Sequence, residues 1–188
     1  MPSSDLARAL KKALAAEPPA AHLAAGGPFT AARPPETAER SVVVLGVGSE
    51  MHRDDAAGVH VVAALSQAPI PGVHAIDGGF APENCTAEIR QLNPSHLLII
   101  DSAHMGEPPG RIRLIDSRDI GGTSFGTHGL PLSVLADYLA SEIGCRVTII
   151  GIQPASVDFG DGLSSEVRQA VEEIVLALRA CWDIPSHP

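Results

Sequence analysis

The sequence predicts an α/β protein in which helices cover both faces of a mainly parallel β-sheet. Apolar runs at residues 42–47 and 97–100 lack the polar alternation of a half-exposed strand, so both faces of these strands are expected to be buried. Between such runs, apolar residues recur every three or four positions, as they do on one face of a helix. Strands that alternate with helices are typical of a three-layer α/β/α sandwich.

The chain of 188 residues is long enough for one well-filled core. Residues 1–40 are expected to hold a helix over 5–16, where leucines repeat every four positions, and then a linker rich in Pro, Ala and Gly. Residues 41–182 are expected to form the α/β domain. We expect the first helix to dock on this domain or on a partner.

The first elements of the domain follow from apolar pattern and turn residues. The run 42–47 is bounded by Gly48, as expected of a buried strand. Residues 55–67 predict a helix whose apolar side carries Val59, Val62 and Leu65. A short strand over 73–76 ends at an Asp-Gly-Gly turn.

The central elements are bounded by equally clear signals. A helix over 84–92 is stopped by Asn93-Pro94. The apolar strand 97–100 then ends on Asp101, and residues 111–115 alternate polar and apolar side chains, which predicts an edge strand.

The last elements complete the alternation. A glycine-containing loop precedes a helix opened by Pro131, and residues 147–152 predict the last strand. The closing helix has the clearest amphipathic face in the chain, formed by Val167, Ala170, Val171, Ile174, Val175 and Leu178.

Composition excludes several functions. A net charge of −9, 3% aromatic residues and the absence of a dense basic patch argue against nucleic-acid binding. No apolar run approaches the ~18 residues of a membrane span, and charged residues interrupt any signal sequence at the N-terminus. The three cysteines form no CxxC pair and are expected to be reduced thiols. We therefore expect a cytoplasmic protein that does not insert into a membrane.

Polar residues at the carboxyl ends of the predicted strands indicate a site, because ligands of open α/β sheets bind at that edge. Asp54 and Asp55 follow the first strand, Asp101 follows the third, and His128 lies in the loop before Pro131. Two carboxylates and an imidazole suit nickel or zinc, which accept oxygen and nitrogen donors together. Asp55, Asp101 and His128 are therefore the candidate ligands and catalytic groups.

Each of these residues also has a structural alternative. Asp54 and Asp55 open a helix, where carboxylates often cap free N–H groups. Asp101 is in a position to bond a neighbouring loop, and His128 to bond backbone. Asp77 stands beside two glycines and is interpreted first as a turn residue and second as a ligand.

Several motifs, in order from Val42 to Leu178, resemble the hydrogenase maturation endopeptidases. The first is Gly46-x-Gly48-Ser49 through Asp54-Asp55-x-x-Gly58. Further segments resemble the branch that serves the formate-hydrogenlyase type of hydrogenase: residues 76–84, 97–101, Met105-Gly106 with Pro109-Gly110, Thr127-His128-x-x-Pro131-Leu132, and Gly151-Ile152-Gln153-Pro154.

The resemblance implies a five-stranded twisted sheet and an aspartic-type endopeptidase that removes the C-terminal extension of a nickel–iron hydrogenase large-subunit precursor after nickel insertion. It places metal contacts on Asp55, Asp101 and His128, with nickel carried by the substrate and no organic cofactor. Separately, we expect the enzyme to be a monomer. Two positions depart from the family pattern: Ser49 stands where Asn is common, and Ala56 where Gly is common.

Three other functions remain open at this point. A non-catalytic nickel-binding hydrogenase maturation chaperone would use the same three residues, and a self-sufficient metallopeptidase would act on metal-free peptides. A nucleotide-binding domain is disfavoured, because the third glycine of the GxGxxG pattern is missing and Asp54-Asp55 would repel a pyrophosphate.

Overall fold

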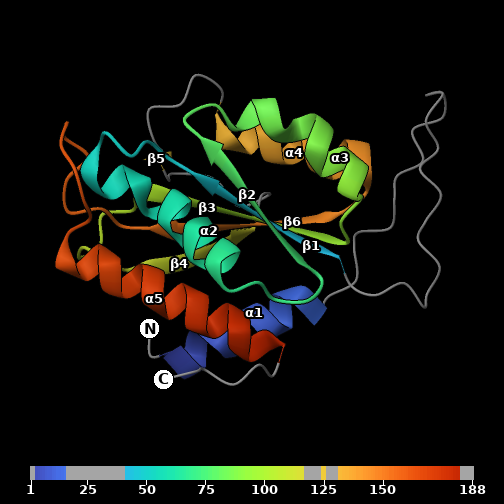
Figure 1. Ribbon diagram of the computed structural model, residues 1–188, viewed down its shortest axis with the longest axis horizontal. Helices are drawn as coiled ribbons and strands as arrows, with labels where there is room; N and C mark the ends of the chain where they lie inside the picture. The colour runs from blue at the N-terminus through green and yellow to red at the C-terminus, as the bar shows by residue number, and fades with distance from the viewer. Residues whose placement is uncertain (1–2, 16–40, 117–123, 126–130, 183–188) are drawn as a thin grey trace.

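The computed structural model describes residues 3–15, 41–116, 124–125 and 131–182. It shows a twisted sheet between two layers of helices (Figure 1). The α/β/α sandwich predicted from the alternating pattern is thus confirmed.

The main sheet, within these residues, has five strands in the order β2-β1-β3-β6-β4. The parallel strands are β1 (Val42–Val47), β2 (Val73–Gly79), β3 (His96–His104) and β6 (Arg146–Ile152). Strand β4 (Ile112–Asp116) lies at the edge of the sheet, as its polar alternation predicted, and it runs antiparallel to β6. A short strand, β5 (Ser124–Phe125), pairs antiparallel with the end of β3.

Helices cover both faces of the sheet. In Figure 1, α2 (Ala57–Gln67) and α5 (Ser165–Cys181) lie on one face, and α3 (Thr86–Leu92) and α4 (Leu132–Ile143) lie on the other. Helices α2 and α3 begin two residues later than predicted, because the short 3-10 turns η1 (Arg53–Ala56) and η2 (Pro82–Cys85) precede them. These turns place polar residues close to the strand ends.

Two hydrophobic cores result from the alternation of side chains along the strands. In β3, Leu98 and Ile100 pack with α2 and α5, whereas Leu97 and Ile99 pack with α3 and α4. Because both faces of these strands are buried, their sequences show no polar alternation, which is the reason that they could be recognised.

Helix α1 (Ser3–Ala15) docks on the domain through α5. Leu6 and Leu10 are fully buried and belong to the same core as Ile174 of α5. Of the two expected docking sites for this helix, the domain is therefore the one observed. The expected linker lies almost wholly outside the described residues, so the division into residues 1–40 and 41–182 stays a prediction.

Strand β3 is longer than predicted, and the expectation that it ends on Asp101 is wrong. It continues to His104 because β6 pairs with it as far as Ser102 and β5 pairs with Ala103 and His104. Partner strands thus extend β3 beyond its apolar run. Asp101 lies inside the strand rather than after it.

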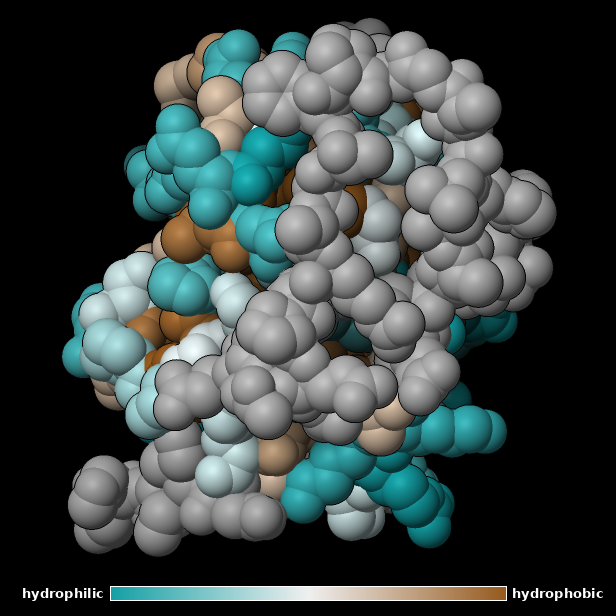
Figure 2. All heavy atoms as spheres, turned by 90° about the vertical axis from the view of Figure 1, so that its right-hand side faces the viewer, coloured by the Kyte–Doolittle hydropathy of each residue, from teal (hydrophilic) through white to brown (hydrophobic). Residues whose placement is uncertain are grey.

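The surface follows from this layered packing. In the space-filling view of Figure 2, hydrophobic residues lie between clusters of hydrophilic side chains. None of the helices in the described part of the chain has the length and apolar content needed to cross a bilayer.

Candidate active site

Glycines allow the chain after β1 to lie against the sheet edge. Gly48 has a φ of +136°, and a Cβ there would lie 1.8 Å from the carbonyl oxygen of Asp55. A Cβ on Gly58 would lie 2.1 Å from the carbonyl oxygen of Ile100. The absence of these two side chains brings the turn η1 and the start of α2 into contact with β1 and β3, and this contact positions Asp55.

Asp55 is a buried carboxylate held at both oxygens. Its Oδ2 accepts a hydrogen bond from the backbone N–H of Ser49 at 2.8 Å, and its Oδ1 accepts one from the hydroxyl of Ser102 at 3.0 Å. The side chain is 4% exposed. Since both oxygens are fixed and Ser102 belongs to β3, Asp55 is anchored against the central strand of the sheet.

Asp101 precedes Ser102 in β3 and is fully buried. Side chains of neighbouring strand residues point to opposite faces, so Asp101 points to the face covered by α3 and α4 while Ser102 points toward Asp55. The two candidate carboxylates are thus related through β3: Asp101 is the sequence neighbour of Ser102, and the hydroxyl of Ser102 donates a hydrogen bond to Asp55.

His128, the third predicted ligand, lies outside the described residues. The chain before it forms β5, in which Phe125 pairs with Ala103, two residues after Asp101. The chain after it enters α4 at Leu132. Among the described residues alone, no group of three or more His, Cys, Asp and Glu side chains is placed to hold a metal ion.

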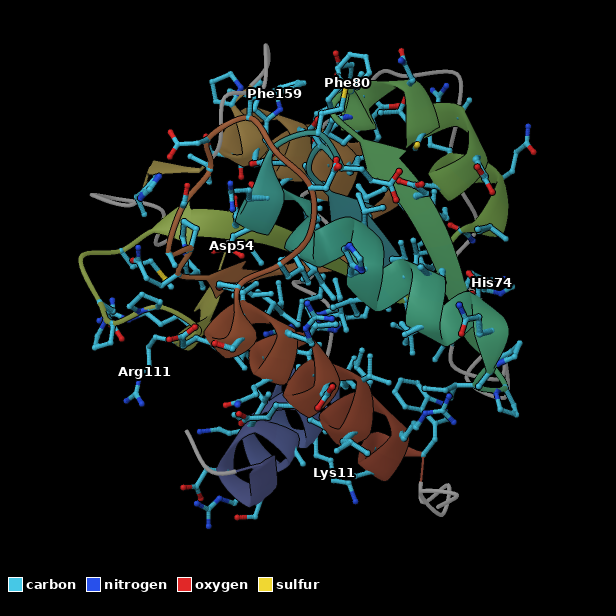
Figure 3. The ribbon with its side chains drawn as sticks, turned by 60° about the vertical axis from the view of Figure 1, so that its left-hand side comes forward. Lys11, Asp54, His74, Phe80, Arg111 and Phe159 are labelled. Carbon is cyan, nitrogen blue, oxygen red and sulfur yellow. The ribbon has the colours of Figure 1, made fainter. Side chains whose placement is uncertain are left out.

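Asp54 has a different environment from Asp55, although the two are adjacent in sequence. Its Oδ2 accepts hydrogen bonds from the N–H groups of Ala155 and Ser156 and from the hydroxyl of Ser164, and its Oδ1 accepts one from the N–H of Ser164. Figure 3 shows Asp54 beside the loop that leads into α5. Asp54 therefore ties η1 to the loop of residues 155–164.

The capping alternative is wrong for both aspartates. The N-cap of η1 is His52 and that of α2 is Ala56, and neither helix start receives a side-chain cap. Asp77 was predicted to lie in a turn after a strand ending at residue 76, and this is also wrong, because β2 continues to Gly79 and Asp77 pairs with Gly46 inside the sheet. Its side chain is exposed, and its Oδ1 accepts a hydrogen bond from the N–H of Gly79 at 2.9 Å.

Two supporting residues were missed by sequence reasoning. Ser102 fixes Asp55, and the only signal for it was its position beside Asp101. The buried Gln153 accepts hydrogen bonds from the N–H groups of Met105 and Glu107 and thereby holds the segment that follows β3. Its signal was a polar side chain directly after an apolar strand.

Of the three described thiols, Cys85 and Cys145 are poor nucleophiles. Burial raises the pKa of Cys85, and the nearby carboxylates of Glu88, Asp77 and Glu83 raise it further. Burial raises the pKa of Cys145 to about 11. A thiol must ionise to attack, so neither Cys85 nor Cys145 is suited to act as a nucleophile at neutral pH.

A pocket of about 370 Å³ lies elsewhere, near the start of β2, whereas Asp55 lies beyond the end of β1. It is formed between the end of α2, the start of β2 and the end of α3, with Leu65, Val73 and Leu92 among its lining residues. It includes neither Asp55 nor Asp101, so the carboxylates and not this pocket define the candidate site.

Comparison with known proteins identifies the family of this chain. A family model described as hydrogenase maturation protease matches residues 59–180. The hydrogenase 3 maturation protease of Escherichia coli strain K12 is 41% identical over 142 residues, which cover 75% of this chain and 90% of that protein.

Two solved structures are also similar. The hydrogenase maturation protease HycI of Thermococcus kodakarensis superposes with a TM-score of 0.70 at 26% identity and covers 78% of this chain and 95% of its own. The endopeptidase HycI of Escherichia coli has a TM-score of 0.66 at 41% identity and covers 72% and 87%. On the family match, the sequence identity and the shared fold, the chain belongs to the hydrogenase maturation protease family.

Proposed function

We propose that this protein is the endopeptidase that removes the C-terminal extension from the large-subunit precursor of a nickel–iron hydrogenase after nickel has been inserted. The observation that carries the proposal is the anchored carboxylate of Asp55 at the carboxyl edge of the parallel sheet, bonded to Ser102 next to the buried Asp101 in β3, in a chain of this family. Ligands of open α/β sheets bind at this edge.

Nickel in the precursor is the element that the enzyme recognises. Carboxylate oxygens and an imidazole nitrogen suit this metal, so Asp55, Asp101 and His128 complete a coordination sphere that the precursor's own thiolates begin. A precursor that lacks nickel lacks this anchor and is not positioned for cleavage. The metal enters and leaves with the substrate, and no organic cofactor takes part.

Hydrolysis then needs an activated water molecule and a polarised peptide carbonyl. The Asp55 carboxylate is held in place by Ser49 and Ser102, which suits the fixed geometry required of a ligand. In an aspartic-type reaction, a carboxylate of this site that is not engaged with the metal would take the proton of the attacking water. Nickel, when bound, serves as the Lewis acid.

The proposal includes the setting in which the protein works. We assign it to the cytoplasm as a monomer, with the large-subunit precursor as its partner. Cys85 and Cys145 are present as thiols rather than in a disulfide, which is the usual state in a reducing compartment.

The decisive experiment is mass spectrometry of a hydrogenase large-subunit precursor, with and without nickel, after incubation with the protein. The wild type should remove a short C-terminal peptide from the nickel-loaded precursor alone. Asp101→Asn and Asp55→Asn should leave both forms intact. Asp77→Asn is the matched control, since Asp77 is exposed near the same edge and its side chain bonds the N–H of Gly79.

Other results would each exclude part of the proposal. Cleavage at the wild-type rate by Asp101→Asn would remove Asp101 from the mechanism. Equal cleavage of nickel-free precursor would exclude recognition through the metal. An intact precursor with retained nickel binding would indicate a non-catalytic maturation chaperone, and chelator-sensitive cleavage of metal-free peptides would indicate a self-sufficient metallopeptidase.

A further inference from the structure

Three large apolar side chains are exposed at the sheet edge that carries Asp55. Met51 is 59% exposed, Phe80 is 74% exposed and Phe159 is 77% exposed. They follow three different strands: β1, β2 and β6. Figure 3 shows Phe80 and Phe159 at the same end of the molecule. Single exposed apolar residues are common, whereas a group of them on converging loops marks an interaction surface.

Backbone hydrogen bonds join the three loops. The N–H of Gly160 donates to the carbonyl of Met51 at 2.9 Å, and the N–H of Arg53 donates to the carbonyl of Gly160 at 2.9 Å. On the other side, the N–H of Gly48 donates to the carbonyl of Gly79 at 2.9 Å, next to Phe80. The loop of residues 48–53 is therefore held between the loops that carry Phe159 and Phe80.

The exposed ring of Phe159 also has an aromatic neighbour. The imidazole of His52 meets it edge to face, with ring centroids 5.9 Å apart and an angle of 85°. The Nδ1 atom of His52 lies 3.2 Å from the hydroxyl oxygen of Ser49. An aromatic side chain that is ordered before binding loses little conformational entropy when a partner covers it.

This surface is continuous with the carboxylate site. Ser49, whose N–H bonds Asp55, belongs to the same loop as Met51. A folded protein that presents its metal to Asp55 must therefore cover that loop. Around the apolar residues, Glu50, Glu83, Asp158 and Asp161 are exposed. One basic residue, Arg53, is exposed in the same loop, so four carboxylates outnumber one guanidinium. The surface is apolar at its centre and mainly acidic at its periphery.

We propose that Met51, Phe80 and Phe159 form an apolar rim that docks the folded large-subunit precursor around its metal site, through an apolar patch bordered by basic residues. This inference rests on the proposed function and deepens it. Metal coordination orients one point of the substrate, while the apolar rim supplies the contact area that holds a folded protein. Large apolar side chains at the centre of an interface commonly carry most of the binding energy.

The test separates binding from chemistry. The double variant Phe80→Ser/Phe159→Ser should raise KM for the nickel-loaded precursor by about 100-fold, on the basis of about tenfold for each ring lost. The kcat at saturating precursor should stay within about twofold of the wild type, because neither ring contacts the reacting groups.

A matched control removes apolar surface elsewhere. Tyr138 on α4 and Leu176 on α5 are 43% and 46% exposed, so Tyr138→Ser/Leu176→Ser removes exposed apolar side chains away from the rim. This control should keep the wild-type KM. A further variant, Glu50→Lys, should raise KM at low salt, and the difference should fade as the ionic strength rises.

The outcomes distinguish the two proposals. A wild-type KM in Phe80→Ser/Phe159→Ser, with cleavage intact, would overturn the apolar rim and leave the proposed function standing. If the wild-type protein cleaves no nickel-loaded precursor, the proposed function fails and the rim proposal fails with it. A wild-type dimer in gel filtration that the double variant converts to monomer, at unchanged KM, would assign the surface to a second copy of this chain and also overturn the proposal.

Discussion

Replacement of Asp54 tests whether this carboxylate stabilises the fold, in contrast to the catalytic role proposed for the neighbouring Asp55. Its carboxylate is 1% exposed and accepts four hydrogen bonds from the loop of residues 155–164. Asp54→Ala leaves three N–H groups and one hydroxyl without their acceptor. At about 1 kcal/mol for each, the free energy of unfolding should fall by about 4 kcal/mol.

Asp54→Asn should have a smaller effect. The amide oxygen can replace Oδ2, but the NH₂ group then faces the N–H of Ser164, so two donors meet. We expect a loss of about 2 kcal/mol for this variant. Because the same loop carries Phe159, both variants should also weaken binding of the precursor if the apolar rim docks it.

Urea unfolding measures these losses. With a slope of about 2 kcal/mol per molar urea, the midpoint should fall by about 2 M for Asp54→Ala and about 1 M for Asp54→Asn. Asp161→Ala is the control, since Asp161 is exposed on the same loop and its removal should change stability by less than about 0.5 kcal/mol. An Asp54→Ala midpoint within about 0.5 M of the wild type would refute the reasoning that this carboxylate holds the loop.

Three further predictions concern other parts of the fold. Gly58→Ala should lower the free energy of unfolding by about 3 kcal/mol in denaturant titration, because the new Cβ would lie 2.1 Å from the Ile100 carbonyl oxygen; unchanged stability would contradict the close approach of α2 to β3. Cys145, with its pKa raised to about 11, should be alkylated at pH 8 at least about 100-fold more slowly than an ordinary thiol, and faster as the pH rises toward 11; rapid labelling of the folded protein at pH 8 would show that the thiol is not buried. Leu10→Ala should cost about 3 kcal/mol in thermal unfolding, because this fully buried side chain joins α1 to the core; a wild-type transition would show that α1 does not contribute to stability.

The candidate site could be found only in part before the structure was known. Asp55 and Asp101 were recognised because carboxylates that follow apolar strands collect at one edge of a parallel sheet. Ser102 could not be assigned, since a hydroxyl beside an aspartate carries no pattern of its own. Its bond to Asp55 depends on how closely α2 approaches β3, which is set by Gly58 and the residues packed around it.

The sequence by itself determined the fold class and the approximate place of the helices and of every strand but β5 in the α/β domain, and it predicted the edge of the sheet that holds the candidate site. These follow from local periodicity, because a strand buried on both faces and an amphipathic helix each have a pattern that can be read within about ten residues. The length of β3 could not be predicted from the local pattern, since pairing with β5 and β6 extends this strand beyond Asp101.

Only the tertiary structure decided the roles of the two adjacent aspartates. Asp54 bonds residues more than 100 positions away, from Ala155 to Ser164, and Asp55 bonds Ser102, 47 positions away. No local pattern distinguishes these neighbours, because each side chain's partner depends on which distant segment passes beside it. The same holds for Met51, Phe80 and Phe159, which become one surface only where three loops meet at the end of the sheet.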